Sequence, residues 1–196
     1  MNYTTLTRVK TALGAEATTS DPHLESIIAS ASRLIDRHCS GKVGLDDYLA
    51  LSTVADEQGQ ARASGDGSIL YPVRKVLVQS VSSFAFRPTP LTDWQSINPQ
   101  HITFDGYMVK AWGENRRAPG NVFVKISYAG GLAATTADLP ADILDAADIL
   151  AVRLFKEIKS GLGDTIGVAE LGTMQYTKAL PARVIEMLKP YKRMIA

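Results

Sequence analysis

Histidine, cysteine and a row of aspartates are the residues of this chain whose types could do chemistry. The three histidines His23, His38 and His101 lie in separate segments, outside any HxxxH, HExxH or HxE spacing. His38 and Cys39 are adjacent and could suggest a thiolate nucleophile, but neighbouring helical residues point about 100° apart. A thiolate is also disfavoured near the C-terminus of a helix, where the dipole is negative. We therefore expect His38 and Cys39 to have structural roles.

Asp142, Asp145 and Asp148 follow one another at intervals of three, which places their carboxylates on one side of a helix. Such a row could indicate a metal site, yet neither a histidine nor a calcium-loop pattern accompanies it. Carboxylates at the start of a helix complement its dipole, and we favour that interpretation. The sequence thus predicts no metal and no cofactor.

Two other groups of residues could form a binding site. Trp94 and Trp112 could stack on a sugar, although packing between strands is the use we favour. Gly161, Gly163 and Gly167 follow a helical pattern and lack the GxxxxGK[ST] spacing of a phosphate loop. We expect a flexible loop over 164–180, or a segment that a partner orders.

An enzyme with an unrecognised site in the middle of the chain is a further hypothesis. Such a site could use His101, Asp105 or Glu114. It lacks a paired nucleophile and base, and we expect the chain not to be an enzyme.

The C-terminal segment 183–193 carries a local charge of +3, from four basic residues and one acid: Arg183, Lys189, Lys192, Arg193 and Glu186. Tyr191, Met194 and Ile195 stand beside this charge. Aromatic residues, Met and Arg are enriched in the cores of protein interfaces. A solvated, frayed chain end is the alternative that composition leaves open.

Composition describes an ordinary globular protein. The 196 residues are 45% hydrophobic and 21% charged, and 21 basic residues against 20 acidic ones leave a net charge of +1. This balance argues against a protein whose main task is to coat nucleic acid. The single cysteine excludes an internal disulfide and a multi-cysteine zinc site. We expect a soluble protein inside a cell, because no apolar run approaches the ~20 residues of a membrane helix and no signal peptide is visible.

Apolar residues at helical spacing occupy both ends of the chain. They predict helices over 4–13, from Ser20 to about Ser40, from Asp138 to about Ser160, and from Pro181 to Pro190. Between them, short β-type runs predict strands over 69–73, 76–86, 102–104, 107–112 and 122–128. We predict an α+β fold. An α-helical bundle core of about four helices (1–42 and 129–196) would carry an inserted antiparallel β-sheet or small β-barrel of five or six strands (43–128).

Three stretches of the sequence resemble a known family. They are YTTLTRVKTALG followed by SDPHLESIIASASRLIDRHCSG, then ISYAGGLAATTADLPADILDAADILAVRLFKEIKSG, and finally YTKALPARVIEMLKPYKRMIA. With these stretches in this order the chain resembles the head-tail connector proteins of tailed bacteriophages and prophages, also called adaptor or head-completion proteins. The resemblance covers about half of the chain, and the block 43–128 is an unusually large insertion for the smallest members.

The resemblance implies a structural virion protein at the head-tail interface, assembled in the host cytoplasm. Copies would form a ring, usually of twelve, beneath the portal protein, and would dock a tail or head-closure protein. DNA would pass through the channel without specific binding. The portal-binding residues would be Leu188, Tyr191, Lys192, Arg193, Met194 and Ile195. A loop toward the ring or its lumen would contain Gly161, Gly163, Asp164 and Gly167. The alternative function is a ligand- or sugar-binding module through Trp94 and Trp112.

Overall fold

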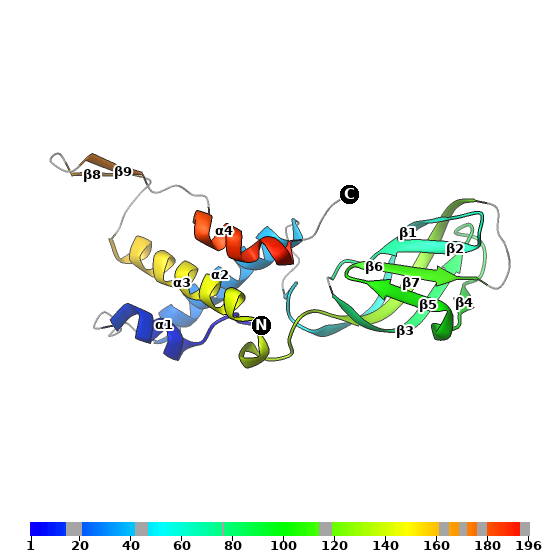
Figure 1. Ribbon diagram of the computed structural model, residues 1–196, viewed down its shortest axis with the longest axis horizontal. Coiled ribbons are helices and arrows are strands. Elements are labelled where there is room, and N and C mark those ends of the chain that lie inside the picture. The colour runs from blue at the N-terminus through cyan, green and yellow to red at the C-terminus, as the bar shows by residue number, and fades with distance from the viewer. Residues whose placement is uncertain are drawn as a thin grey trace. The chain divides into compact units, whose positions relative to one another are not determined.

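The chain folds into two compact units in a computed structural model (Figure 1). The structure describes residues 1–14, 21–41, 47–75, 77–113, 119–160, 165–168, 172–175 and 180–192. The helical unit comprises Met1–Asp47 and Thr135–Ala196, and the β unit comprises Tyr48–Ala134. The fold is therefore α+β, with helices from both ends of the chain and strands from its middle.

The β unit starts and ends later in the chain than the predicted insertion 43–128. At its end the last strand continues to Gly130. Beyond that strand, the Leu132 amide donates to the Leu49 carbonyl (2.7 Å) and the Leu51 amide donates to the Ala133 carbonyl (2.8 Å). These backbone hydrogen bonds tie the two connecting segments to each other within the β unit.

Four α-helices make up most of the helical unit: α1 (Leu6–Leu13), α2 (Asp21–Ser40), α3 (Ala141–Ser160) and α4 (Ala182–Leu188). Short 3-10 turns, η3 (Thr136–Asp138) and η4 (Lys189–Tyr191), precede α3 and follow α4. The Thr5 hydroxyl accepts from the Arg8 amide at the start of α1, and Gly14 ends that helix with a φ of 60°. Each helix begins or ends within three residues of its predicted limit.

Apolar stripes at helical spacing hold this unit together. Helix α3 packs on α1, α2 and α4. The stripes are buried almost completely and consist of Val9, Leu13, Leu24, Ile27, Ile28, Ala31, Ile35, Ile143, Ala146, Ala147, Leu150, Ala151, Phe155, Val184 and Leu188. The arrangement of the helices as a bundle core stays a prediction.

A hairpin of two short strands, β8 (Thr165–Val168) and β9 (Gly172–Gln175), lies between α3 and α4 in the sequence. The strands are antiparallel, with Ile166 opposite Met174 and Gly167 opposite Thr173. The sequence predicted only a loop here. Glycines within such short runs weaken the sequence pattern of a strand, so the hairpin is recognised only from the pairing of β8 with β9.

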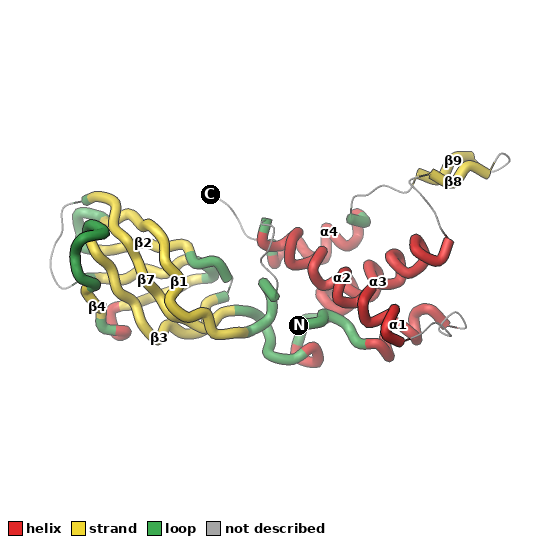
Figure 2. Tube along the Cα trace, turned by 180° about the vertical axis from the view of Figure 1, so that it is seen from behind, coloured by secondary structure: helices red, strands yellow, loops and turns green. Residues whose placement is uncertain are grey.

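Seven antiparallel strands form one sheet in the β unit, in the order β4-β3-β7-β1-β2-β6-β5 (Figure 2). The strands are β1 (Ser52–Ala63), β2 (Ser68–Pro72), β3 (Val78–Arg87), β4 (Gln95–Ile97), β5 (Ile102–Asp105), β6 (Met108–Trp112) and β7 (Gly120–Gly130). The sheet curls into a nearly closed barrel. The Val78 amide at the start of β3 donates to the Gly106 carbonyl (2.9 Å) in the β5–β6 turn.

Strand β1 is the longest strand and was missing from the sequence prediction. It pairs with both β2 and β7, so it is central to the sheet. Only three of its side chains are buried, namely Glu57, Ala61 and Ala63. A polar strand whose inward residues are small or charged carries almost no local hydrophobic alternation.

Candidate interaction surfaces

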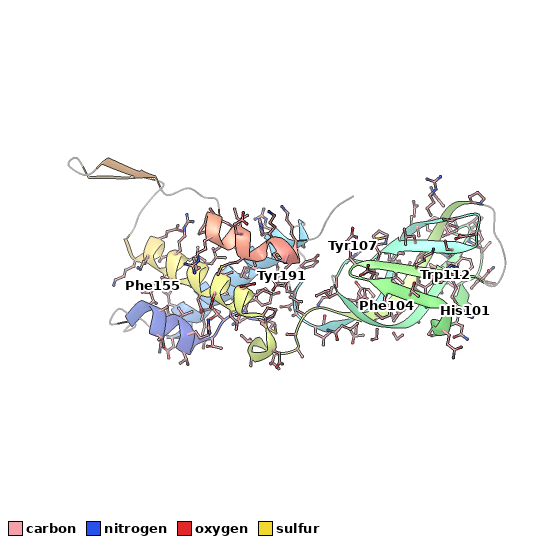
Figure 3. All side chains as sticks on the ribbon, viewed as in Figure 1. His101, Phe104, Tyr107, Trp112, Phe155 and Tyr191 are labelled. Carbon is pink, nitrogen blue, oxygen red and sulfur yellow. The ribbon has the colours of Figure 1, made fainter. Side chains whose placement is uncertain are left out.

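The C-terminal end of the described chain interacts electrostatically with two other helices of its unit. Burial, followed by the charge of Asp142 at the start of α3, raises the pKa of the Tyr191 phenol. The positive charge of the exposed Lys192 contributes to the lowered pKa of His38, which lies in the last turn of α2. Tyr191 therefore lies near the start of α3 (Figure 3), and Lys192 lies near the end of α2.

The six residues predicted to bind the portal have different environments. Leu188 is fully buried, so in the folded unit its side chain anchors α4 and does not lie on a surface. Tyr191 is half-buried and Lys192 is exposed. Arg193, Met194 and Ile195 lie outside the described residues. The structure therefore separates an anchor at Leu188 from a segment that begins at Tyr191.

The predicted ring or lumen loop falls mostly outside the described residues, which exclude Gly161, Gly163 and Asp164. Gly167 lies in β8, where it pairs with Thr173 of β9.

Arg8 binds two of the aspartates in the row on α3. Its guanidinium forms ion pairs with Asp145 (2.9 Å) and Asp148 (2.6 Å), and the Thr4 hydroxyl donates to Asp148 as well. These contacts join α1 and its preceding turn to α3. Within the described ranges, no cluster of three His, Cys, Asp or Glu residues could hold a metal ion. Two of the three carboxylates, Asp145 and Asp148, thus have a structural use in linking two helices.

Cys39 is fully buried, and burial followed by the charge of Asp36 raises the pKa of its thiol to about 12. A thiol with that pKa is protonated near neutral pH and is a poor nucleophile. Burial also lowers the pKa of His38, with Lys192 contributing second. The pair therefore lacks the thiolate that nucleophilic catalysis would need.

Both tryptophans are half-buried, and each ring contacts a cation of its own chain. The Arg87 guanidinium carbon lies 4.4 Å from the centre of the Trp94 ring, and the Lys110 ammonium lies 4.8 Å from the Trp112 ring. The Lys125 ammonium lies 5.5 Å from Trp94. The rings contact cations of neighbouring strands, and a sugar-binding role for them stays a prediction.

Two residues of the hypothetical catalytic site, His101 and Asp105, stand at the two ends of β5 in the sequence. His101 is exposed in the 3-10 turn η2 (Pro99–His101) (Figure 3), whereas Asp105 is exposed at the end of β5. Glu114 lies outside the described residues. No hydrogen bond or ion pair joins His101 to Asp105 in the part of the chain that is described.

Sequence reasoning missed two buried acids. Asp36 accepts hydrogen bonds from the Tyr3 hydroxyl and from the Asp47 amide (2.9 Å). In the barrel, Glu57 accepts from the Tyr128 hydroxyl (2.8 Å) and the Tyr71 hydroxyl (3.1 Å). Their donors are between 11 and 71 residues away in the sequence, so no local motif could have revealed them.

Helices of the described ranges are too short or too polar to cross a lipid bilayer.

Two solved structures share the fold. A chain from the neck of an empty GTA particle, computed with C6 symmetry, has a TM-score of 0.54 and 14% identity, over 97% of this chain and 90% of that one. A chain from the virion of a native gene transfer agent (GTA) particle has a TM-score of 0.54 and 12% identity, with the same coverage. At these identities the likeness concerns the fold alone. A search of curated proteins gives no match.

The sequence profile of one protein family, described as head completion protein, matches residues 2–194. The match spans both units, including the block 48–134 between the helical segments. Nearly the whole chain is therefore accounted for by one family, and the chain belongs to the head completion protein family.

Proposed function

We propose that this chain is a structural virion protein that forms an adaptor ring between the portal of the head and the tail. The family match over residues 2–194 is the observation that carries the proposal. The fold shared with chains of a GTA neck and a GTA virion supports it. In this role the protein acts in the assembled particle, after assembly in the host cytoplasm, and has no catalytic step.

The adaptor would assemble by contacts between unlike faces of neighbouring copies. A closed ring of identical subunits needs two different, complementary surfaces on each subunit. We propose twelve copies, with the portal protein on one side and a tail or head-closure protein on the other. The net charge of +1 suits a channel through which DNA slides, because many phosphate contacts would hold the DNA tightly.

The C-terminal segment is the proposed portal-binding element. The buried Leu188 anchors α4, and Pro190 in η4 ends the helix. The segment that begins at Tyr191 therefore follows a well-packed helix. The binding residues are then Tyr191 and Lys192 together with Arg193, Met194 and Ile195. The loop around Gly161, Gly163, Asp164 and Gly167 would face the ring or its lumen.

Cosedimentation with the portal protein encoded beside this chain tests the proposal. Electron microscopy of the complex should show a ring stacked on the portal. A variant truncated after Lys192 should fail to sediment with the portal, while its melting temperature stays unchanged.

The matched control is Leu188→Ala, which changes the anchor. We expect it to lower the free energy of unfolding by about 2–5 kcal/mol, since it removes a fully buried leucine side chain. Full portal affinity in the truncated protein would contradict the role of the C-terminal segment. A folded full-length protein that ignores the portal would contradict the adaptor ring itself.

A further inference from the structure

An apolar groove lies between α1 and α3, which are side by side in the helical unit (Figure 1). It has a volume of about 410 Å³, and its exposed lining is mostly apolar. The residues that line it are Ala12, Asp148, Ile149, Val152, Arg153 and Lys156. Ile149 and Val152 are half-buried and three residues apart, so they share one face of α3. The groove is therefore an open, concave surface that suits an apolar group.

The charges at this groove balance one another. Asp148 accepts from Arg8 (2.8 Å), and Arg153 donates to Glu157 (2.8 Å). With their ion-pair partners, the charged lining residues are three bases and three acids, namely Arg8, Arg153 and Lys156 against Asp145, Asp148 and Glu157. A surface without net charge has little attraction for a phosphate backbone. The groove therefore favours an apolar part of a protein over nucleic acid.

The other side of α3 exposes an isoleucine. Ile158 is 54% exposed, the highest value among the large hydrophobic residues of the helical unit in the described ranges. Leu154 lies one turn earlier on the same face and is half-buried. At about 100° per residue, Ile158 lies about 150° around the helix from the midpoint of Ile149 and Val152. One helix thus carries an apolar groove and an apolar ridge on nearly opposite sides.

We propose that Ile158 of one copy enters the α1–α3 groove of the next copy in the ring. This inference rests on the proposed function, and it names the two faces that meet and the one occupant, a second copy of this chain. A subunit of a closed ring contacts its neighbours through two unlike, complementary faces. The ridge and the groove are such a pair, whereas a two-fold dimer would need a single self-complementary face.

The positions of the two surfaces restrict how α3 lies in the ring. Ile158 is about 11 Å further along the helix than the midpoint of Ile149 and Val152. Copies in a closed ring are related by rotation alone, so the ridge and the groove must meet at the same height along the ring axis. We therefore expect α3 to run obliquely to that axis.

Thiol crosslinking of portal-bound protein tests this contact. A variant with both Val152→Cys and Ile158→Cys is bound to the portal protein, and a short bifunctional maleimide is then added. The native Cys39 does not interfere, because its side chain is fully buried. We expect a ladder of crosslinked copies on a denaturing gel, since each chain then has one thiol at each face. A bridge within one chain would not produce a ladder.

The two single variants are the matched controls. Val152→Cys alone and Ile158→Cys alone should each leave the chains uncrosslinked, because unlike faces meet. An equimolar mixture of the two should give crosslinked dimers and nothing larger, because each chain then has only one reactive thiol.

Ile158→Glu tests the same contact without a crosslinker. It places a carboxylate in an apolar groove, and we expect about tenfold fewer copies bound per portal. Its melting temperature should equal that of the wild type, because more than half of the side chain is exposed. Leu70→Glu is the control. Leu70 is 46% exposed on β2 of the β unit, outside the contact, so this variant should bind as the wild type does.

Three results would overturn the contact. They are the absence of crosslinks between copies in the double variant, a crosslink from Val152→Cys alone to a second copy or to the portal protein, and a full ring in Ile158→Glu. Wild-type protein that does not bind the portal would overturn the proposed adaptor function and the ring contact with it. The wild-type binding experiment therefore distinguishes the two failures.

Discussion

Glu57 shows how a single residue organises the inside of the β unit. Its side chain is buried, and its carboxylate accepts hydrogen bonds from Tyr128, Tyr71 and the amide of Arg74. Burial, with Glu57 as a later contribution, raises the pKa of Tyr128 beyond its usual range. Tyr128 therefore stays protonated as a donor to this carboxylate, and the acid joins β1 to β2, β7 and the turn after β2.

Replacing Glu57 should cost more stability than replacing one of its donors. In Glu57→Ala two buried tyrosine hydroxyls and the partly buried Arg74 amide lose their acceptor, and we expect the free energy of unfolding to fall by about 3 kcal/mol. Tyr71→Phe removes one donor and should cost about 1 kcal/mol. Urea unfolding followed by tryptophan fluorescence measures both. Equal losses in the two variants would show that the carboxylate is not the centre of this network.

His38 makes the stability of the helical unit depend on pH. Burial, and secondly Lys192, lowers its pKa in the folded state below the ordinary value of 6.5. The unfolded chain therefore binds a proton at a higher pH than the folded chain does. Stability from neutral His38 is complete above about 6.5 and declines as the pH falls through that value toward the folded pKa.

Melting temperatures measured between about pH 7.5 and pH 5 test this prediction. The wild type should lose more thermal stability over that range than His38→Asn, whose amide does not titrate. Parallel curves for the two proteins would exclude His38 as a source of the pH dependence.

At the scale of elements, close backbone contact joins the segments at the two ends of the β unit. Gly131 has a φ of 126°, and a Cβ atom built on it would lie 2.3 Å from the Ala50 carbonyl oxygen. That contact involves backbone on both sides, so neither segment can yield as a flexible side chain would. Glycine is therefore required where the chain leaves β7.

Gly131→Ala should lower the free energy of unfolding of the β unit by about 2 kcal/mol or more, from positive φ and overlap together. Gly65→Ala is the control, because a Cβ atom there meets nothing within 4 Å. Thermal unfolding followed by far-ultraviolet circular dichroism compares the two variants. A Gly131→Ala protein as stable as the Gly65→Ala protein would contradict the close approach of Gly131 to Ala50.

At the scale of the whole molecule, the β unit lies between the two chain segments that form the helical unit. Each unit has its own core, and the barrel core is made of residues from the β unit alone. The segments that enter and leave the barrel are hydrogen-bonded to each other between Leu49 and Leu132. A short linker should therefore be enough to join these two segments when the barrel is removed.

We predict that replacing 48–134 with a short Gly-Ser linker leaves a folded helical unit, and that 48–134 alone folds as a barrel. Circular dichroism should show a cooperative thermal transition for each piece. The shortened protein should still sediment with the portal, since it retains the C-terminal segment. A non-cooperative transition in either piece would contradict the independence of the two units.

The sequence alone determined the helices, several strands and the family. Helical stripes such as Leu24, Ile27, Ile28 and Ala31 repeat every three or four residues, so a short window reveals which face is buried. The Asp105-Gly106 dipeptide is likewise a local sequence signal for a hairpin, and in the structure β5 and β6 pair on either side of it. The resemblance to head-completion proteins also rested on contiguous stretches, and the family match agrees with it.

Only the tertiary structure decided which residues are anchors and which are surface. Leu188 and Leu91 are the same amino acid near prolines, yet one is 0% and the other 97% exposed. Strand β1 and the buried acids Asp36 and Glu57 depend on partners far along the chain. Burial and strand pairing are set by contacts between distant segments of the chain. A local sequence pattern therefore does not predict them.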